Sequence, residues 1–358
     1  MSDTSPISGL DPAAVADFQD VLISAKRIVA LLGAGVSASS GLTTFRGTNG
    51  LWKNQDVTQV ASPAGFRHDP GLVWQFYSYR RREALQASPN AAHFALAELA
   101  RRLPGFVTLS QNVDNLSPRA GHPAAQLKLL HGNLFDLHCS DEVGCRFVDK
   151  GNFEDPLCPA LGTEREEVEV MGRIEDGDRP RASPLLIAGI ARKHAQILGE
   201  RFDEAEPSVD DFRALRSLDK DQTPGSVKSD IRLSSGLSQD DLPQCPQCRK
   251  QILRPSVVWF GESLPVDIVQ DIEAIFADPE PIDLFLTIGT SSMVWPAAGY
   301  ALEAQKKGAR VAVINTDAGD AKGLRPNRDW TFVGDTAVLV PELLKPVIGD
   351  ESTWERAR

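Results

Sequence analysis

Residues 33–46 read GAGVSASSGLTTFR and directly follow the apolar segment 26–32. Glycines in such a turn let the backbone approach a pyrophosphate, and the hydroxyls of Ser37 and Ser40 can donate to phosphate oxygens. The spacing differs from the usual dinucleotide-binding fingerprint, and alone the turn fits a ligand-free connection between a strand and a helix equally well. The aromatic ring and the cation in the final FR favour a ligand, because together they can cover a charged group.

Four apolar segments end in small or polar residues, which is typical of buried parallel strands that lead into a ligand site. These segments are 26–32, followed by the glycine-rich turn, 106–109, followed by SQNVDN, 282–288, followed by GTSS, and 311–314, followed by NTD. Ligands of open α/β sheets bind outside the carboxyl ends of the strands. We therefore expect the four strand ends to converge on one ligand.

The spacing of these segments predicts an α/β fold with a Rossmann-like parallel sheet and helices on both faces. Asp11 followed by Pro12 is typical of a helix start. We expect this domain to be discontinuous. Its predicted parts are residues 12–131 and 255–348, with tails at 1–11 and 349–358.

The cysteines lie between the second and third predicted strands, which indicates a small inserted zinc-binding domain over residues 132–254. Four thiolates close a tetrahedral site with no open position, so this zinc is expected to be structural. The expected ligands are Cys139, Cys145, Cys245 and Cys248.

Two alternatives for the cysteines stay open, because the spacing between Cys139 and Cys145 is wider than usual. Cys158 could replace Cys145, or the thiols could be reduced without metal. Residues 163–242 are mostly polar and acidic and are expected to be a partly helical or disordered insert in this domain.

The chain has 358 residues and a formal net charge of −11. An acidic balance argues against non-specific nucleic-acid binding, which needs a basic face. Five cysteines, an odd number, fit a reduced compartment, and no apolar run is long enough to span a bilayer. No Lys or Arg precedes Lys26, unlike secretory signals or mitochondrial presequences, so we expect the cytoplasm and/or nucleus.

Six motifs resemble, in order, those of the sirtuin family of NAD-dependent protein deacylases. They are GAGVSASSGLTTFR at 33–46, SQNVD at 110–114, LHG at 130–132, RPSVVWFGE at 254–262, GTSS at 289–292 and NTD at 315–317. The resemblance spans roughly residues 20–345 and leaves the acidic insert unmatched. It implies the Rossmann-like fold, NAD as the co-substrate and a structural zinc ion.

The resemblance also implies a role for each matched position. The implied NAD-binding residues are Gly33, Ala34, Gly35, Ser37, Phe45, Arg46, Gln111, Asn112, Asp114, Gly289, Thr290, Ser291, Asn315, Thr316, Asp317 and Thr336. Phe45 and Arg46 would cover the nicotinamide. Asn112 would act at the nicotinamide ribose, and Asp114 would contact the carboxamide.

The chemistry of such a reaction calls for one base. Cleavage of the bond between nicotinamide and ribose resembles glycoside cleavage, and the amide oxygen that replaces nicotinamide is a weak nucleophile that must be positioned well. A ribose hydroxyl must then lose a proton to attack the acyl carbon, a task that suits histidine near neutral pH. We assign His131, in LHGNLF, to this role rather than to the core, whereas His93 resembles a structural histidine of the family.

The segment WQFYSYRR at 74–81 resembles the class III branch of the family, whose members prefer malonyl-, succinyl- and glutaryl-lysine. Tyr77 and Arg80 match the Tyr-x-x-Arg pair of its acyl pocket, and a spacing of three places them on one helix face. Both can donate to a carboxylate, which an acetyl group lacks. A solvated basic run at 80–82 is the alternative. The remaining substrate-binding positions would be Val258, Phe260, Gly261 and Glu262.

We therefore expect an NAD-dependent protein-lysine deacylase that removes acidic acyl groups and releases nicotinamide, free lysine and O-acyl-ADP-ribose. A plain deacetylase, an ADP-ribosyltransferase and a catalytically weak NAD-binding scaffold are the alternatives. The expected partners are acyl-lysine proteins, not nucleic acid or membranes, and the expected state is a monomer. Family analogy adds the mitochondrion as a compartment, although no presequence is visible.

Overall fold

The computed structural model describes six stretches of the chain, which are residues 9–44, 51–52, 55–162, 235–290, 297–320 and 323–354. These residues belong to one compact unit, apart from Ser235, which falls in a second unit of residues 181–235. Phe45, Arg46 and Ser291 lie outside the described residues, as do residues 163–234 of the predicted insert.

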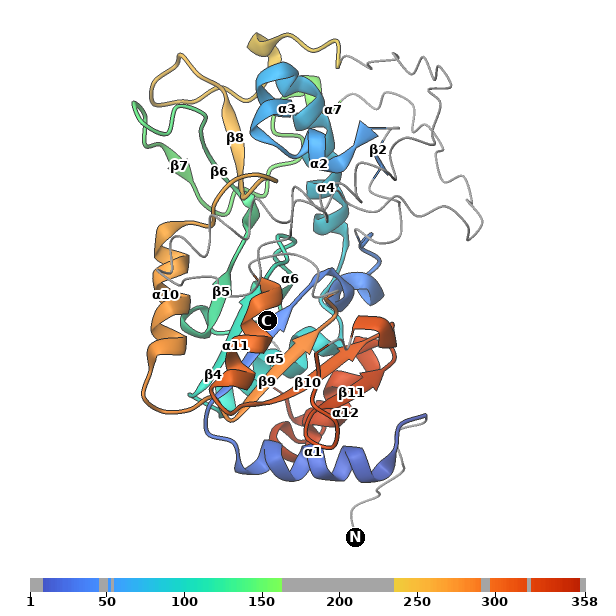
Figure 1. Ribbon diagram of the computed structural model, residues 1–358. Helices are drawn as coiled ribbons and strands as arrows, with labels where there is room; N and C mark the ends of the chain where they lie inside the picture. Colours follow the sequence, from blue (N-terminus) through green and yellow to red (C-terminus); the bar gives the residue numbers. More distant parts are fainter. Residues whose placement is uncertain are drawn as a thin grey trace, which may run out of the picture. The chain divides into compact units, whose positions relative to one another are not determined.

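A six-stranded sheet, parallel throughout, confirms the predicted α/β fold (Figure 1). Its strands in spatial order are β11 (Trp330–Val333), β10 (Arg310–Asn315), β9 (Leu284–Ile288), β1 (Ile28–Leu32), β4 (Phe106–Ser110) and β5 (Leu127–Leu129). Strand β1 lies between β9 and β4, and all its residues are buried. Helices cover both of its faces, which explains its uninterrupted apolar sequence.

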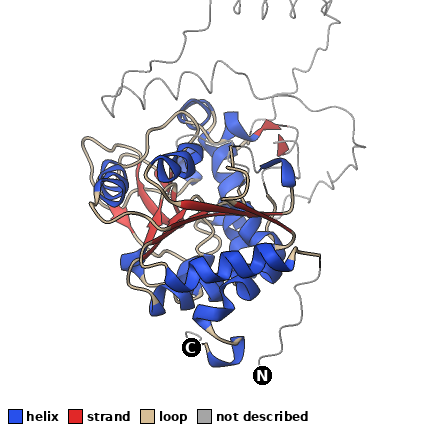
Figure 2. Ribbon diagram, turned by 60° about the horizontal axis from the view of Figure 1, so that its bottom comes forward, coloured by secondary structure: helices blue, strands red, loops and turns tan. Residues whose placement is uncertain are grey.

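Helices cover both faces of the sheet, as predicted (Figure 2). Alternate β1 residues divide between two cores, with Ile28 and Ala30 in one and Val29 and Leu31 in the other. The first core includes α1 (Pro12–Ser24), α5 (Ala91–Arg102) and α12 (Thr336–Ile348), and the second includes α10 (Val266–Ala277) and α11 (Ala297–Lys306). The predicted helix start is confirmed, because the Asp11 carboxylate accepts the Ala13 N–H at 3.0 Å and caps α1.

A small antiparallel sheet forms the cysteine-containing module, in the order β7–β6–β8. Its elements are β6 (Gly132–Cys139), β7 (Val148–Asp149), α7 (Pro159–Gly162), the short 3₁₀ helix η3 (Gln239–Asp241) and β8 (Leu253–Val257). Leu242 is buried in the core of this module. Because η3 and Leu242 fall within the range 163–242, the last residues of the predicted insert are part of the folded module.

Three helices between β1 and β4 share the core of this module, which we call the cysteine module from here on. They are α2 (Val57–Val60), α3 (Pro63–His68) and α4 (Pro70–Gln86). Trp74 of α4 is fully buried, and its indole N–H donates to the Leu253 carbonyl of β8 at 3.0 Å. These helices therefore pack with the cysteine module, whereas the predicted domain 12–131 grouped them with the parallel sheet.

The carboxyl-terminal end also differs from the prediction. Residues 349–358 were expected to be a tail, yet Trp354 is 7% exposed and belongs to the core that α1, α5 and α12 form. Its indole N–H donates to the Ile348 carbonyl at 3.1 Å. The last turn of α12 is therefore covered by a buried aromatic ring.

Shorter elements connect these parts. They are η1 (Ala34–Ser40), β2 (Leu51–Trp52), β3 (Gln55–Asp56), α6 (Leu116–Arg119), η2 (Ala124–Gln126), η4 (Ala318–Asp320) and η5 (Glu351–Thr353). Within the described ranges, no helix combines the length and the hydrophobicity that a membrane crossing requires.

The arginine run at 80–82 is not a solvated basic surface, because Arg81 is only 1% exposed. Its guanidinium group donates to three backbone carbonyls of the cysteine module, those of Leu134 at 2.6 Å, Asn152 at 2.8 Å and Glu154 at 2.9 Å. Burial lowers the pKa of Arg81 to about 10, so the group is charged at neutral pH. Arg81 therefore attaches α4 to the cysteine module.

Replacing Arg81 by methionine should destabilise the protein by about 3 kcal/mol, because three buried carbonyls lose a charged donor. The matched control is Arg82→Met, which removes a half-exposed guanidinium paired with Asp155 and should cost about 0.5 kcal/mol. Urea unfolding measures both changes. Equal losses in the two variants would show that the Arg81 contacts contribute no more than a surface ion pair.

Candidate active site

The turns that follow β1 and β9 touch through their backbones. The Gly33 N–H donates to the Ile288 carbonyl at 3.0 Å, and the Gly35 N–H donates to the Gly289 carbonyl at 2.8 Å. A Cβ atom on Gly35 would lie 2.7 Å from the Gly289 oxygen. Gly289 itself has φ +61°, and a Cβ there would lie 2.4 Å from the Val36 nitrogen. The glycines of both motifs are therefore required for contact between the two turns.

The turn after β4 is bonded to both of these turns. The Asn112 amide nitrogen donates to the Gly33 carbonyl at 3.0 Å. The Thr290 hydroxyl donates to the Gln111 side-chain oxygen at 3.0 Å. Residues from three strand ends are thus held in one hydrogen-bonded group.

The last residue of β10 and the first residue of α12 join the same hydrogen-bonded group. The Asn315 amide nitrogen donates to the Thr290 carbonyl at 2.9 Å, and Asn315 is 7% exposed. Thr336 opens α12, is 2% exposed, and its hydroxyl donates to the Gly35 carbonyl at 3.3 Å. Thr316 and Asp317 follow β10 on the exposed surface. The structure thus brings the described strand-end residues together, while their contacts with NAD stay a prediction.

Ser37 is a buried residue of the glycine-rich turn. It is 2% exposed, and its hydroxyl donates to the Asp114 carboxylate at 2.6 Å. The other carboxylate oxygen of Asp114 accepts the Leu116 N–H at 2.9 Å. Because the only hydroxyl hydrogen is given to Asp114, the expected donation from Ser37 to phosphate oxygens does not fit this arrangement.

His131 lies between β5 and β6, beside the turn after β4. Its Nδ1 is 3.0 Å from the Gln111 carbonyl oxygen, which can only accept, so Nδ1 carries the hydrogen and Nε2 of the neutral ring is unprotonated. Burial lowers the pKa of His131, and the hydrogen bond to Gln111 partly opposes this shift. The ring is therefore neutral near pH 7, with a basic nitrogen.

The segment after β8 is bonded directly to His131. The Val258 N–H donates to the His131 carbonyl at 2.9 Å. Two residues further on, the Phe260 N–H donates to the Ala61 carbonyl at 2.9 Å, and Phe260 is 40% exposed. The predicted acyl-lysine position Val258 is thus bonded to the histidine, whereas Phe260 is bonded to Ala61, just after α2.

Glu262 stabilises the turn in this segment. Its carboxylate accepts two hydrogen bonds from Arg254, at 2.8 and 2.9 Å, and one from the Trp259 N–H at 2.8 Å. Its own N–H donates to the Trp259 carbonyl at 3.0 Å. The side chain and N–H of Glu262 are therefore bonded within the protein. The predicted strand-like pairing of Gly261 and Glu262 with substrate would have to use their other backbone groups.

Arg254 was not recognised as a site residue, although it stands at the start of RPSVVWFGE. It is 7% exposed, and its guanidinium carbon lies 3.5 Å from the centre of the Trp259 ring. The sequence signal that could have identified Arg254 was an arginine eight residues before a glutamate, with a tryptophan between them. Sequence spacing alone could not show that Arg254 stacks on Trp259 and donates to Glu262.

Tyr77 and Arg80 of α4 lie near this segment. Tyr77 is 4% exposed, and its ring centre is 6.3 Å from that of Trp259. Burial raises the pKa of Tyr77, so its hydroxyl keeps its hydrogen and can donate. Arg80 donates to the Thr43 carbonyl at 3.3 Å, which connects α4 to the end of the glycine-rich turn. The role of this pair in an acyl pocket stays a prediction.

Four cysteine sulfur atoms form one cluster in the cysteine module. The sulfurs of Cys139, Cys145, Cys245 and Cys248 all lie within 4.8 Å of one another, and two pairs are 3.7 Å apart. Zinc–sulfur bonds of about 2.3 Å place the sulfurs of a tetrahedral site about 3.8 Å apart, so this donor set fits structural zinc. Cys158 is outside the cluster, since its thiol donates to the Asp241 carbonyl at 3.1 Å.

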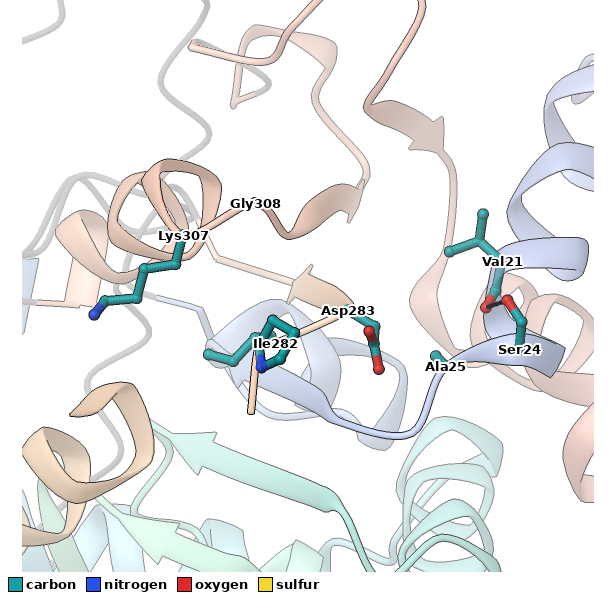
Figure 3. Close-up of a pocket in the computed structure, with 8 residues that line it drawn as sticks. Val21, Ser24, Ala25, Ile282, Asp283, Lys307 and Gly308 are labelled. Carbon is teal, nitrogen blue, oxygen red and sulfur yellow. Dashed lines mark hydrogen bonds between the residues drawn. The ribbon is translucent and has the colours of Figure 1, made fainter. Parts of the chain in front are cut away.

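Two cavities lie at the opposite, amino-terminal ends of the strands and take no part in this site. The first, of about 280 Å³, is lined by the end of α1 and by Asp283, which Figure 3 shows beside Ala25. The Asp283 carboxylate accepts the N–H groups of Lys26 and Arg27, at 2.8 and 2.9 Å, so it holds the start of β1. The second, of about 420 Å³, contains an ion pair between Lys128 and Asp271.

The sequence and fold match proteins of one family. The sequence matches the profile described as the Sir2 family over residues 33–154 and 221–296. It is 41% identical over 340 residues to an NAD-dependent protein deacylase of Candida albicans, covering 93% of this chain and 98% of the relative. It is 31% identical over 338 residues to the NAD-dependent protein deacylase sirtuin-5, mitochondrial, of Canis lupus familiaris, covering 93% and 85%. A crystal structure of a Sir2 homolog–NAD complex matches with a TM-score of 0.61 and 27% identity, over 93% of each chain.

Metal analysis should find one zinc ion per purified chain, and Cys145→Ser should abolish it because a hydroxyl is a poor zinc ligand. Cys158→Ser is the matched control and should retain the metal, since Cys158 is outside the cluster. A structural ion contributes to folding, so Cys145→Ser should also lower the melting temperature. Loss of zinc from Cys158→Ser with retention in Cys145→Ser would reverse the ligand assignment.

Proposed function

The chain belongs to the Sir2 family, and we propose that it uses NAD to remove acyl groups from protein lysines. The observation that carries this proposal is the hydrogen-bonded group of strand ends, with His131 attached to it through the Gln111 carbonyl at 3.0 Å. This arrangement supports His131 as the base beside the residues expected to bind NAD. The relatives named as NAD-dependent protein deacylases support the same activity.

The turns after β1, β4 and β9 would bind NAD. The Gly35 N–H is already bonded to Gly289, so the glycines act chiefly by bringing the two turns together. Asn112 donates its amide hydrogens to Gly33 and Ser37, at 3.0 and 3.4 Å, so its oxygen is left to accept from a ribose hydroxyl or a water molecule. Bound NAD would supply an electrophilic ribose carbon when nicotinamide leaves.

His131 would accept the proton of a ribose hydroxyl at Nε2. Its Nδ1–H remains bonded to Gln111, which holds the ring in one orientation and stabilises the protonated form when it appears. The neighbouring Val258 belongs to the segment expected to hold the acyl-lysine, so base and substrate would meet at one point. The expected products are nicotinamide, free lysine and O-acyl-ADP-ribose.

We further propose that the acyl group is acidic, of the malonyl, succinyl or glutaryl type. Tyr77 and Arg80 lie on α4, next to Trp259 and Thr43 respectively, and can offer donors to a carboxylate. The dog relative named sirtuin-5 is consistent with this choice at 31% identity. A plain deacetylase is the competing function, and ADP-ribosyl transfer is a further one.

Partners and compartment form a further part of the proposal. The deacylase names indicate protein substrates, whereas the monomeric state and the lack of nucleic-acid binding stay predictions. The dog relative is named mitochondrial, so the predicted cytoplasmic or nuclear location competes with a mitochondrial one.

The acid limb of the pH profile should report the His131 imidazole. The base is the neutral form and burial lowers its pKa, so kcat/KM should stay high at pH 7 and fall as the pH drops through a value below about 6.5. His131→Asn should reduce lysine formation by about 10²- to 10⁴-fold. His68→Asn, at an exposed position, is the control and should behave like the wild type. An unchanged acid limb in the His131 variant would assign the base elsewhere.

A peptide panel that differs only in the acyl group tests the acidic preference. The wild type should act faster on succinyl- than on acetyl-lysine, and Arg80→Met should lower kcat/KM on the succinyl peptide by about 10- to 100-fold, because a charged hydrogen bond is lost. The acetyl rate should change little. Arg82→Met, two residues away on the exposed side, is the control. A succinyl preference that survives in Arg80→Met would exclude Arg80 from the acyl pocket.

A further inference from the structure

Glu83, near the end of α4, has one carboxylate oxygen that is buried and accepts no hydrogen bond from the described residues. This oxygen is Oε2, whereas Oε1 accepts the Tyr79 hydroxyl hydrogen at 2.7 Å. A carboxylate oxygen that is removed from water and receives no hydrogen bond is destabilising unless a nearby positive charge compensates it. The position of Oε2 therefore calls for such a charge.

The compensating charge is that of Arg80, one turn earlier on α4. Its Nη1 is 3.9 Å from Glu83 Oε2, and the two side chains are 18% and 21% exposed. This distance is longer than a hydrogen bond of about 2.7–3.2 Å. Nη1 donates instead to the Thr43 carbonyl, at 3.3 Å. Glu83 therefore acts on Arg80 through its charge and does not direct the orientation of the guanidinium group.

Arg80 also acts electrostatically on Tyr77, the other α4 residue of the predicted acyl pocket. Burial raises the pKa of Tyr77, and the positive charge of Arg80 is one of the effects that partly oppose this shift. An acidic acyl group bound by Tyr77 and Arg80 would place a second carboxylate beside a guanidinium that Glu83 already partly neutralises. The two carboxylates would repel each other, and screening by water is limited because the Glu83 side chain is only 21% exposed.

We propose that Glu83 is a specificity-determining residue of the acyl pocket and that it weakens the binding of acidic acyl groups. A malonyl, succinyl or glutaryl carboxylate has to share the Arg80 charge with Glu83. An acetyl group carries no charge, so Glu83 leaves its binding unchanged. Arg80 thus favours acidic acyl groups, and Glu83 limits the size of that preference. The inference rests on the proposed function, because it requires the acyl group to reach Arg80.

A positioning role and a purely structural role make different predictions for Glu83. If Glu83 held Arg80 in the orientation that binds substrate, replacing it would lower activity on succinyl-lysine. If it only stabilised α4, as side-chain pairs at i and i+3 can do, replacing it would change activity on all acyl groups equally. The sign of the change and its dependence on the acyl group therefore separate the three roles.

Glu83→Gln removes the charge but keeps the shape of the side chain and an oxygen that can accept from the Tyr79 hydroxyl. Its kcat/KM on a succinyl-lysine peptide should rise about three- to tenfold, mainly through a lower KM, because one repulsive charge is lost. On the acetyl-lysine peptide of the same sequence, kcat/KM should change by less than about twofold. A fall or no change on the succinyl peptide, or an equal change on both peptides, would overturn the proposal.

Asp155→Asn is the matched control, because it removes the carboxylate partner of Arg82, another arginine of α4. The Asp155 side chain is 22% exposed, close to the 21% of Glu83, and its Oδ2 is 3.1 Å from Arg82 Nε. This variant should keep the wild-type ratio of succinyl to acetyl kcat/KM. A rise as large as that in Glu83→Gln would show that net charge alone is responsible and would overturn the proposal.

The ratio for the two peptides also distinguishes failure of this inference from failure of the proposed function. Both peptides are measured on one preparation, so the ratio does not depend on the fraction of enzyme that is folded. If Arg80→Met lowers the ratio while Glu83→Gln does not raise it, the acyl pocket is supported and the role of Glu83 is wrong. If neither variant changes the ratio, the proposed acidic-acyl pocket is wrong as well.

Discussion

The backbone contact between the turns after β1 and β9 is the constraint on which the candidate site depends. The Gly35 N–H reaches the Gly289 carbonyl at 2.8 Å, a distance that no Cβ on either residue would allow. Asn112, Thr290 and Asn315 then bond to the joined turns. The carboxyl ends of neighbouring parallel strands are close together in any such sheet. Here direct hydrogen bonds also join the turns that follow them.

A second set of contacts links His131, the proposed base, to these turns. His131 is held by the Gln111 carbonyl on one side and by the Val258 N–H on the other. It therefore connects the parallel sheet to the segment after β8, where Trp259 stacks on Arg254 of β8 and Glu262 forms an ion pair with the same arginine. The proposed base, the expected NAD residues and the expected acyl-lysine segment are consequently linked through backbone groups, which tolerate little displacement.

The parallel sheet and the meeting of its strand ends could be predicted because buried strands have continuous apolar sequences that stop at small residues. Packing between distant segments could not be predicted. Helix α4 has mixed composition, and only the three-dimensional contacts show that Arg81 is buried against the cysteine module. Similarly, Ser37 has the residue type of a phosphate ligand, but the position of Asp114 directs its hydrogen inward. Trp354 shows the same limit, since one aromatic residue in a polar terminus carries no periodic signal.

Separate hydrophobic cores support the two proposed binding regions. The strand ends that would bind NAD are built on the cores of the parallel sheet, whereas α4, with Tyr77 and Arg80, is built on the core of the cysteine module. Substitutions in one core therefore need not disturb the geometry of the other. The proposed acyl selectivity could therefore evolve through substitutions in one core without altering the proposed dinucleotide site built on the others.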